Sequence, residues 1–205
     1  MTEKEKMLAN KIYDPNDDEL LLLRTRAHHY CVDYNHTYDE EDTKRKEILD
    51  SLMPNRGENT YLQGPIFFDY GINIYTGKNF YANFNFTCLD VAKVIIGNDV
   101  FCGPNVSLLT PMHPFLPQER AYYINEKHRV TDKEYSKEIH IGDNCWICGN
   151  VTIVGGVTIG EGSIIGAGSV VTKSIPPHSL ACGNPCKVIR QITEQDSIYL
   201  KKELL

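Results

Sequence analysis

The stretch from Ile141 to Pro176 reads IGDNCW ICGNVT IVGGVT IGEGSI IGAGSV VTKSIP and divides into units of six residues. The fifth position of each unit is small or β-branched, and the second is glycine in half of them. An α-helix has 3.6 residues per turn, so it cannot hold a six-residue period on one face, and glycine and β-branched residues disfavour it further. The first position of every unit is aliphatic: Ile141, Ile147, Ile153, Ile159, Ile165 and Val171.

A parallel β-helix accounts for this period. Each hexad would form one short strand and one corner, with the first-position side chain pointing inward and glycine permitting the dihedral angles of the corner. Three hexads would then close one triangular coil. The same phase recurs upstream at Ile96 and Cys102, and more weakly from Thr76. We therefore expect a mainly β protein with a solenoid over about residues 60–185.

The repeat is interrupted once. The separation in sequence between the inward positions Cys102 and Ile141 is not a multiple of six. An extruded loop of about residues 110–137 explains the change of register, and it begins with the sequence TPMHP.

The two ends of the chain differ from the solenoid. Residues 2–53 contain no glycine, and Thr2 and Glu5 have the spacing of a capping box. We expect helices at about 2–10, 16–34 and 39–53, with Pro15 near the first turn of the second helix. The tail that follows Pro185 is also expected to be helical.

Composition excludes several classes of protein. Hydrophobic residues make up 41% and charged residues 23%, as in ordinary globular proteins, and the longest leucine run covers only Leu20 to Leu23. The N-terminus lacks the apolar stretch of a signal peptide, so we expect a cytoplasmic protein without a membrane partner. A net charge of −6 argues against sequence-independent nucleic-acid binding. The seven cysteines are interpreted as free thiols.

Several motifs together carry a family resemblance. They are the hexads, DYG at 69–71, NFYANFN at 79–85, the HP pair at 113–114, IGDNCW at 141–146 and the ending from Ile165 to Arg190. In combination they resemble the maltose and galactoside O-acetyltransferases, which are hexapeptide-repeat enzymes of the left-handed β-helix acyltransferase superfamily. The resemblance covers nearly the whole chain. It implies an N-terminal helical segment (1–58), a left-handed β-helix (59–185), a C-terminal tail (186–205) and a homotrimer.

The resemblance also implies acetyl transfer from acetyl-CoA to a hydroxyl of a sugar of the maltose, glucose or galactoside type. A sugar hydroxyl is a weak nucleophile near neutral pH, so a base must take its proton, and histidine has a suitable pKa. His113 matches the catalytic histidine of the family and is expected to act by direct transfer. A backbone donor for the developing oxyanion is expected just after Trp146 and Ile147, although Cys148 stands where relatives more often have glycine.

Binding residues follow from the same resemblance. Carboxylates and amides suit sugar hydroxyls, while Lys and Arg suit the phosphates of CoA. Asp14 could alternatively cap a helix, and Asn83 could be a corner residue. The expected sugar-binding residues are Asp14, Asp69, Asn83 and Asp90. The expected cofactor-binding residues are Trp146, Gly149, Ala167, Thr172, Lys173, Lys187 and Arg190.

The sequence also allows a metal site and two other functions. Two histidine and cysteine sets could suggest a metal site: Cys145, Cys148, Cys182 and Cys186, or His113, His128 and His140, the latter as in β-helical carbonic anhydrases. We expect no metal, because Cys145 should point inward and Cys148 should lie at a corner. Acyl transfer to an amino-acid hydroxyl or a xenobiotic, or a non-catalytic scaffold, are the alternative functions.

Overall fold

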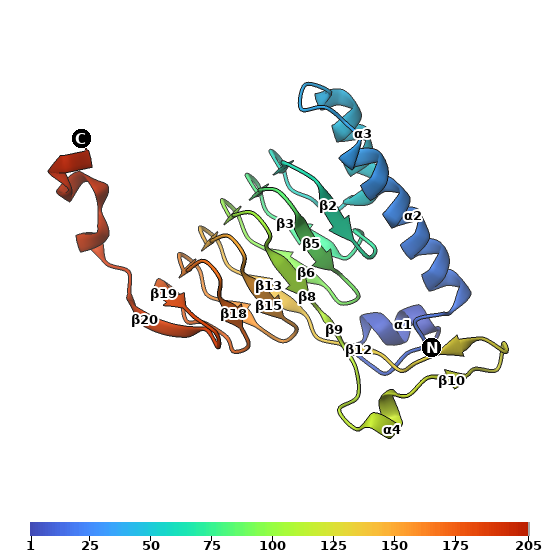
Figure 1. Cartoon of the computed structure of the whole chain (residues 1–205). Helices are drawn as coiled ribbons and strands as arrows, with labels where there is room; N and C mark the ends of the chain where they lie inside the picture. The colour runs from blue at the N-terminus through green and yellow to red at the C-terminus, as the bar shows by residue number, and fades with distance from the viewer. Residues whose placement is uncertain (205) are drawn as a thin grey trace.

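The computed structural model describes residues 1–204 and shows a left-handed parallel β-helix with helices at its N-terminal end (Figure 1). Three sheets form the sides of a triangular prism. The first contains β1 (Tyr61–Leu62), β4 (Tyr81–Ala82), β7 (Phe101–Cys102), β14 (Trp146–Ile147), β17 (Ile164–Ile165), β19 (Ser179–Cys182) and β20 (Lys187–Gln191). The second contains β2 (Ile66–Phe68), β5 (Phe86–Leu89), β8 (Ser107–Leu109), β15 (Thr152–Val154) and β18 (Val170–Val171). The third contains β3 (Ile74–Thr76), β6 (Val94–Ile96), β13 (Ile139–Ile141) and β16 (Thr158–Ile159).

The core of the prism is built from the repeating positions. Among the first positions Ile141 is 2% exposed and the five that follow are fully buried, so the predicted inward direction is confirmed. Burial of each such side chain stabilises the fold by about 1.5–3 kcal/mol. The fifth positions are buried as well, which leaves the strand residues between them to face outward.

The corners use glycine differently from the prediction. Positive φ angles occur at the fourth position of the hexad, in Asn144, Asn150, Gly156, Gly162 and Gly168. The second-position glycines have ordinary φ angles but lie against the next coil. A Cβ on Gly142 would lie 2.6 Å from the nitrogen of Glu161, and one on Gly160 would lie 2.3 Å from that of Pro177. Close stacking therefore explains these glycines.

Coil length changes along the prism. Trp146 pairs with Ile164, so this coil consists of three hexads. Ile164 pairs with Leu180, so the last coil is two residues shorter. Tyr61 pairs with Tyr81, which makes the first coil longer than three hexads. The additional residues lie between the second and third sheets, at the edge of the prism that we call edge A. Edge A comprises residues 69–73, 90–93, 110–138, 155–157 and 172–174.

The N-terminal helices cover the first coil. They are α1 (Glu3–Leu8), α2 (Asp18–Asn35) and α3 (Asp42–Leu52), in agreement with the three predicted helices. The carboxylate of Asp17 caps α2 by accepting a hydrogen bond from the Glu19 amide, so Pro15 precedes the helix. The hydroxyl of Tyr34 donates to the carbonyl of Leu62 at 2.5 Å. These contacts close the open end of the solenoid.

The extruded segment at edge A is ordered and leaves the prism near α1 (Figure 1). It contains β9 (Pro111–Met112), α4 (Pro117–Arg120), β10 (Tyr123–Ile124), β11 (Val130–Thr131) and β12 (Tyr135–Ser136). Strand β9 pairs with β12, and β10 pairs with β11, both antiparallel. A β-bridge joins Tyr13 to Glu134, so this segment packs on the N-terminal segment of the same chain.

The prediction of a helical tail is wrong for Lys187–Gln191. Residues Lys187–Gln191 form β20, which pairs antiparallel with β19 and satisfies the open edge of the last coil. The β-branched residues Val188 and Ile189 favour this strand. Three short 3-10 helices follow: η1 (Glu194–Asp196), η2 (Ile198–Leu200) and η3 (Lys202–Leu204). In residues 1–204, no helix has both the length and the apolar character needed to cross a membrane.

Candidate active site

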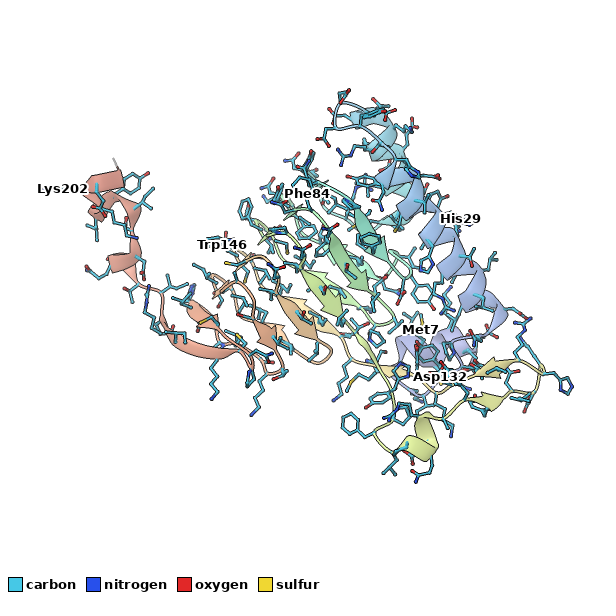
Figure 2. The ribbon with its side chains drawn as sticks, in the orientation of Figure 1. Met7, His29, Phe84, Asp132, Trp146 and Lys202 are labelled. Carbon is cyan, nitrogen blue, oxygen red and sulfur yellow. The ribbon has the colours of Figure 1, made fainter. Side chains whose placement is uncertain are left out.

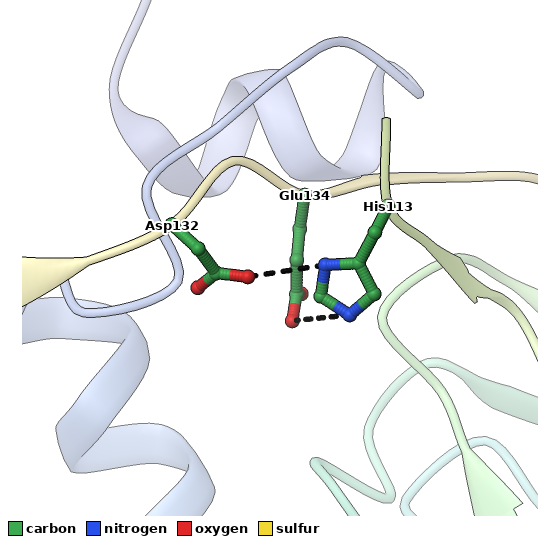
Figure 3. A group of neighbouring side chains, drawn as sticks. All are labelled: His113, Asp132 and Glu134. Carbon is green, nitrogen blue, oxygen red and sulfur yellow. Dashed lines mark ion pairs between the residues drawn. The ribbon is translucent and has the colours of Figure 1, made fainter. Parts of the chain in front are cut away.

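His113 lies at the start of the extruded segment, next to two carboxylates from the end of that segment (Figure 3). Its Nδ1 is 3.0 Å from Oδ2 of Asp132, and its Nε2 is 3.9 Å from Oε1 of Glu134. The imidazole is 44% exposed, whereas the side chains of Asp132 and Glu134 are 16% and 18% exposed. The arrangement presents one accessible histidine whose ring nitrogens both face carboxylates.

Glu134 is held by the N-terminal segment. The hydroxyl of Tyr13 donates a hydrogen bond to its Oε2, and the Tyr13 amide donates to its carbonyl at 2.9 Å. Burial raises the pKa of the Glu134 carboxyl above its ordinary value, while the Tyr13 hydrogen bond and His113 oppose this shift. The pKa of the Tyr13 hydroxyl is raised by burial and by Glu134, so Tyr13 keeps its proton as a donor.

Asp14 joins the N-terminal segment to the extruded segment. Its Oδ1 accepts a hydrogen bond from Thr131 Oγ1 at 2.5 Å, and its Oδ2 accepts one from Asn125 Nδ2 at 2.7 Å. The amide of Asn16 adds a third, at 2.9 Å. Burial alone would raise the pKa of Asp14, but these hydrogen bonds outweigh it and hold the pKa below its ordinary value. The carboxylate thus fastens the two segments together instead of capping a helix.

Asp69 also lies at edge A. Its carboxylate is 20% exposed, and Nε2 of His28 on α2 lies 3.8 Å away. Burial raises the pKa of Asp69, although Arg24 and His28 pull it down. The same residue lines a cavity of about 250 Å³ between α2 and the second sheet, together with His28 and Asn35.

Asp90 does not reach the surface. It is fully buried, and its two oxygens accept hydrogen bonds from the amides of Tyr70 at 2.8 Å and Asn73 at 3.1 Å. In the next coil Thr110 takes the same place, since its hydroxyl accepts from the Ala92 amide at 3.0 Å. The prediction that Asp90 binds the sugar is therefore wrong for this structure. Its buried carboxyl instead accepts hydrogen bonds from backbone amides of the preceding coil and so holds the corner at edge A.

Other predicted residues lie at a different edge, between the first and second sheets, which we call edge B. Edge B comprises residues 83–85, 103–106, 148–151, 166–169 and 182–183. Asn83 and Trp146 line a shallow cavity of about 460 Å³ there, with Tyr81 and Phe101. Trp146 lies on the solenoid, well away from Asp132 of the extruded segment (Figure 2). The structure does not bring Asn83 and Trp146 together with His113 within one chain.

The cofactor candidates are divided between the two edges. Gly149 and Ala167 stack at edge B, and the Gly149 amide donates to no acceptor among residues 1–204. Lys187 of β20 pairs with Cys182 of β19 and is exposed next to edge B. Arg190 instead forms two hydrogen bonds to Asp196, at 2.8 and 2.6 Å. Thr172 and Lys173 are exposed at edge A.

The outer face of the first sheet carries a row of aromatic side chains. The strand register places Tyr61, Tyr81, Phe101 and Trp146 next to one another. The rings of Tyr61 and Tyr81 are stacked, with centroids 6.0 Å apart. Phe101 and Trp146 are each 52% exposed. Contiguous apolar surface of this kind is typical of a contact with another protein or a ligand.

The side chains that could ligate a metal ion belong to neither of the two sets considered from the sequence. Within residues 1–204, neither the four cysteines nor His113, His128 and His140 gather into a group that could ligate an ion. Cys145 is buried, as predicted from the repeat. One group does have suitable spacing: ligand atoms of His113, Asp132 and Glu134 all lie within 4.8 Å of one another.

Reasoning from the sequence missed Tyr13, Asp132 and Glu134. Their signal was weak, because Tyr13 and Glu134 come from distant segments of the chain that meet only after folding. The spacing of Asp132 and Glu134, two residues apart just before β12, was the only local indication in the sequence that both side chains could share a direction.

Comparison with known proteins identifies the family. The profile "Maltose acetyltransferase hexapeptide capping motif" matches residues 6–57, and "Bacterial transferase hexapeptide (six repeats)" matches residues 138–173. Galactoside O-acetyltransferase of Escherichia coli is 39% identical, over 99% of this chain and 96% of that protein.

Solved structures agree with this result. The crystal structure of a maltose O-acetyltransferase from Clostridium difficile is 43% identical, with a TM-score of 0.86, over 95% of this chain and 99% of that one. A galactoside acetyltransferase in complex with coenzyme A is 40% identical, with a TM-score of 0.87, over 96% of this chain and 94% of that one. The chain belongs to the maltose and galactoside O-acetyltransferase family of hexapeptide-repeat acetyltransferases.

Proposed function

We propose that this protein transfers the acetyl group of acetyl-CoA to a hydroxyl group of a sugar of the maltose, glucose or galactoside type, with His113 as the general base. The observation that carries the proposal is the exposed imidazole of His113, held between Asp132 and Glu134 in a chain of this acetyltransferase family. Similarity to a galactoside acetyltransferase solved with coenzyme A supports acetyl-CoA as the co-substrate.

The reaction is a direct transfer. The acceptor hydroxyl gives its proton to Nε2 of His113 while its oxygen bonds to the carbonyl carbon of the thioester. The carbonyl electron pair moves onto oxygen and forms a tetrahedral oxyanion. When that pair returns, the carbon–sulfur bond breaks and the departing thiolate takes the proton from the imidazolium. The products are an acetyl ester and CoA with a free thiol.

The burial of the cysteines argues against a cysteine nucleophile. Cys88 and Cys102 point into the core of the prism and are at most 1% exposed. Burial raises the pKa of both thiols, and a thiol must ionise to attack a thioester. Neither side chain can reach a bound acetyl group without opening the core.

Two edges of one chain suggest a site shared between copies. His113, Asp69 and Lys173 belong to edge A, whereas Gly149 and Asn83 belong to edge B. In a homotrimer, edge A of one protomer could face edge B of the next. The Gly149 amide, which has no acceptor among residues 1–204, would then be available to the oxyanion or the pantetheine arm. The aromatic row of the first sheet offers apolar surface for that contact.

An acceptor screen tests the proposed reaction. Acetyl-CoA consumption would be followed by thiol release with glucose, maltose, thiogalactosides, serine and chloramphenicol, and products would be identified by mass spectrometry. We expect a sugar to give the highest kcat/KM and an acetyl ester as product. Turnover only with serine or chloramphenicol would favour the alternative acyltransferase function. Absence of CoA binding would favour a scaffold.

The assembly has its own test. Light scattering should give about three chains per particle, and Phe101→Arg should weaken the assembly because it places a charge in the apolar row. A monomer with full activity would contradict the shared site.

A further inference from the structure

Asp132 contacts the candidate base but has no part in the chemistry described above. Its Oδ2 lies 3.0 Å from Nδ1 of His113, whereas the oxygen nearest to Nε2, Oε1 of Glu134, lies 3.9 Å away (Figure 3). The side chain of Asp132 is 16% exposed, so water screens this contact only in part. The two ring nitrogens therefore have unequal surroundings.

This inequality bears on the tautomer of His113. A neutral imidazole carries its proton on one nitrogen and an acceptor lone pair on the other. A carboxylate at Nδ1 favours the proton there by electrostatic attraction, and Nε2 then keeps the lone pair. A general base needs that free lone pair at the nitrogen that meets the acceptor hydroxyl.

Glu134 does not offset the preference of the His113 proton for Nδ1. One of its oxygens already accepts a hydrogen bond from the Tyr13 hydroxyl. The other is beyond hydrogen-bond distance of Nε2. Burial also raises the pKa of the Glu134 carboxyl, which shifts its equilibrium toward the neutral form relative to a solvated carboxylate.

The backbone around Asp132 is fixed on both sides. The preceding residue, Thr131, is fully buried and donates to Asp14. On the other side of Asp132, Glu134 forms a two-way backbone pair with Tyr13, with N–O distances of 2.9 and 3.3 Å. The N-terminal segment thus holds the stretch between β11 and β12 that carries Asp132, although the two are distant in the sequence.

We propose that Asp132 is a positioning residue, which keeps the proton of neutral His113 on Nδ1 so that Nε2 is free to act as the base, and that Asp14 holds the extruded segment in the place this requires. The proposal rests on the proposed function for its catalytic meaning. Its structural content, the tautomer of His113, can be measured without any acceptor.

The first test reads the tautomer directly. The full-length protein with ¹⁵N-labelled histidine would be examined by long-range ¹H–¹⁵N correlation above the titration range of histidine, and His113→Asn would identify the resonances. We expect the Nδ1–H form in the natural protein, a shift toward Nε2–H in Asp132→Asn, and recovery of the Nδ1–H form in Asp132→Glu. Glu119→Gln, an exposed carboxylate of α4 in the same segment, is the control and should leave the spectrum unchanged.

The second test is kinetic. Asp132→Asn should lower kcat by up to about 100-fold and change the KM for acetyl-CoA little, because misplacement of a catalytic group affects the chemical step. Asp132→Glu should recover part of the loss. Thermal unfolding of each variant would verify folding, and Asp132→Ser replaces any variant that does not fold.

The outcomes separate the two proposals. An unchanged tautomer in Asp132→Asn would overturn the positioning role, whatever the activity of the enzyme. A change in the His113 resonances of the natural protein on addition of EDTA would place a metal ion at the group of His113, Asp132 and Glu134, and would also overturn it. A tautomer shift without any acetyl transfer by the natural protein would support the positioning role and count against the proposed function.

Discussion

The C-terminal and N-terminal halves of the solenoid are built from the same hexads but differ in coil length. From β13 to β18, stacked residues are three hexads apart, as in the pairing of Thr152 with Val170. Before β8 they are further apart, as in the pairing of Ile74 with Val94. The strict half contains no insertion, whereas every additional residue of the other half lies at edge A.

This difference in coil length separates the regular coils, which serve as scaffold, from edge A of the longer coils, which carries the candidate catalytic residues. The regular coils stack closely, and the second-position glycines at their corners leave no room for a side chain. Edge A of the longer coils carries Asp69 and the buried Asp90, and its third corner extends into the segment that holds His113. A repeat that satisfies its own backbone hydrogen bonds can thus accept an insertion at one edge without losing its core.

The largest expected effect concerns that edge. His113→Ala should lower turnover by roughly a hundred- to ten-thousandfold, the range typical of a lost general base, while acetyl-CoA binding measured by calorimetry changes little. His29→Ala is the matched control, because that histidine is exposed on α2 and lies well away from Asp132 (Figure 2). Near-normal turnover of the His113 variant would contradict the assignment of the chemistry to edge A.

A second substitution probes the regular half. Ile159→Ala should reduce the free energy of unfolding by about 2–5 kcal/mol, because it opens a cavity at a fully buried inward position. Thr158→Ala, one residue earlier on the exposed side of β16, should change it by no more than about 0.5 kcal/mol. Urea unfolding measures both values. Equal effects would contradict the assignment of inward and outward positions.

Asp90 at edge A should make the stability of the fold depend on pH. Burial raises the pKa of this carboxyl from 3.8 to about 6, against the opposing hydrogen bonds from the Tyr70, Gly71 and Asn73 amides. The folded state therefore holds the proton more tightly than the unfolded state, so the contribution of Asp90 to stability falls as pH rises from about 4 to about 6.

Asp90→Asn should flatten this slope in urea unfolding measured at pH 4, 5, 6 and 7. Asp143→Asn is the control, because hydrogen bonds from Asn98 lower the pKa of Asp143, so its contribution to stability rises with pH instead of falling. A slope that persists without Asp90 would assign the pH dependence to another group.

The smallest effect concerns β20, which carries the predicted phosphate-binding residues Lys187 and Arg190. Lys187→Ala should weaken CoA binding by about 3- to 10-fold, as expected for one exposed charge next to phosphate. Arg190→Ala should do less, because Asp196 already pairs with the Arg190 guanidinium. Lys44→Ala on α3 is the control. A stronger effect at Arg190 than at Lys187 would mean that the Asp196 pair opens when CoA binds.

The fold could be predicted largely from the hexads, because a strict aliphatic period leaves few ways to bury the side chains. The prediction failed at Lys187–Gln191, where pairing with the open edge of β19 decides the structure. Position in a repeat also could not show that Asp90 points into a corner and meets backbone amides.

The candidate site could be predicted from the sequence only in part. His113 was identified from the HP motif, but its neighbours Asp132, Glu134 and Tyr13 depend on how the extruded segment folds back onto the N-terminal segment. That packing is set by contacts such as Asp14 with Thr131, which join residues distant in the sequence and leave no periodic pattern.

The central claim is that the acetyl group passes directly from CoA to the acceptor, with His113 of edge A as the base. Incubation of the protein with acetyl-CoA in the absence of any acceptor, followed by intact mass spectrometry and peptide mapping, tests this most directly. We expect unmodified protein, together with intersecting double-reciprocal plots once a sugar is supplied. Stoichiometric acetylation before the sugar is added, at Cys88, Cys102 or any other residue, with ping-pong kinetics, would contradict it.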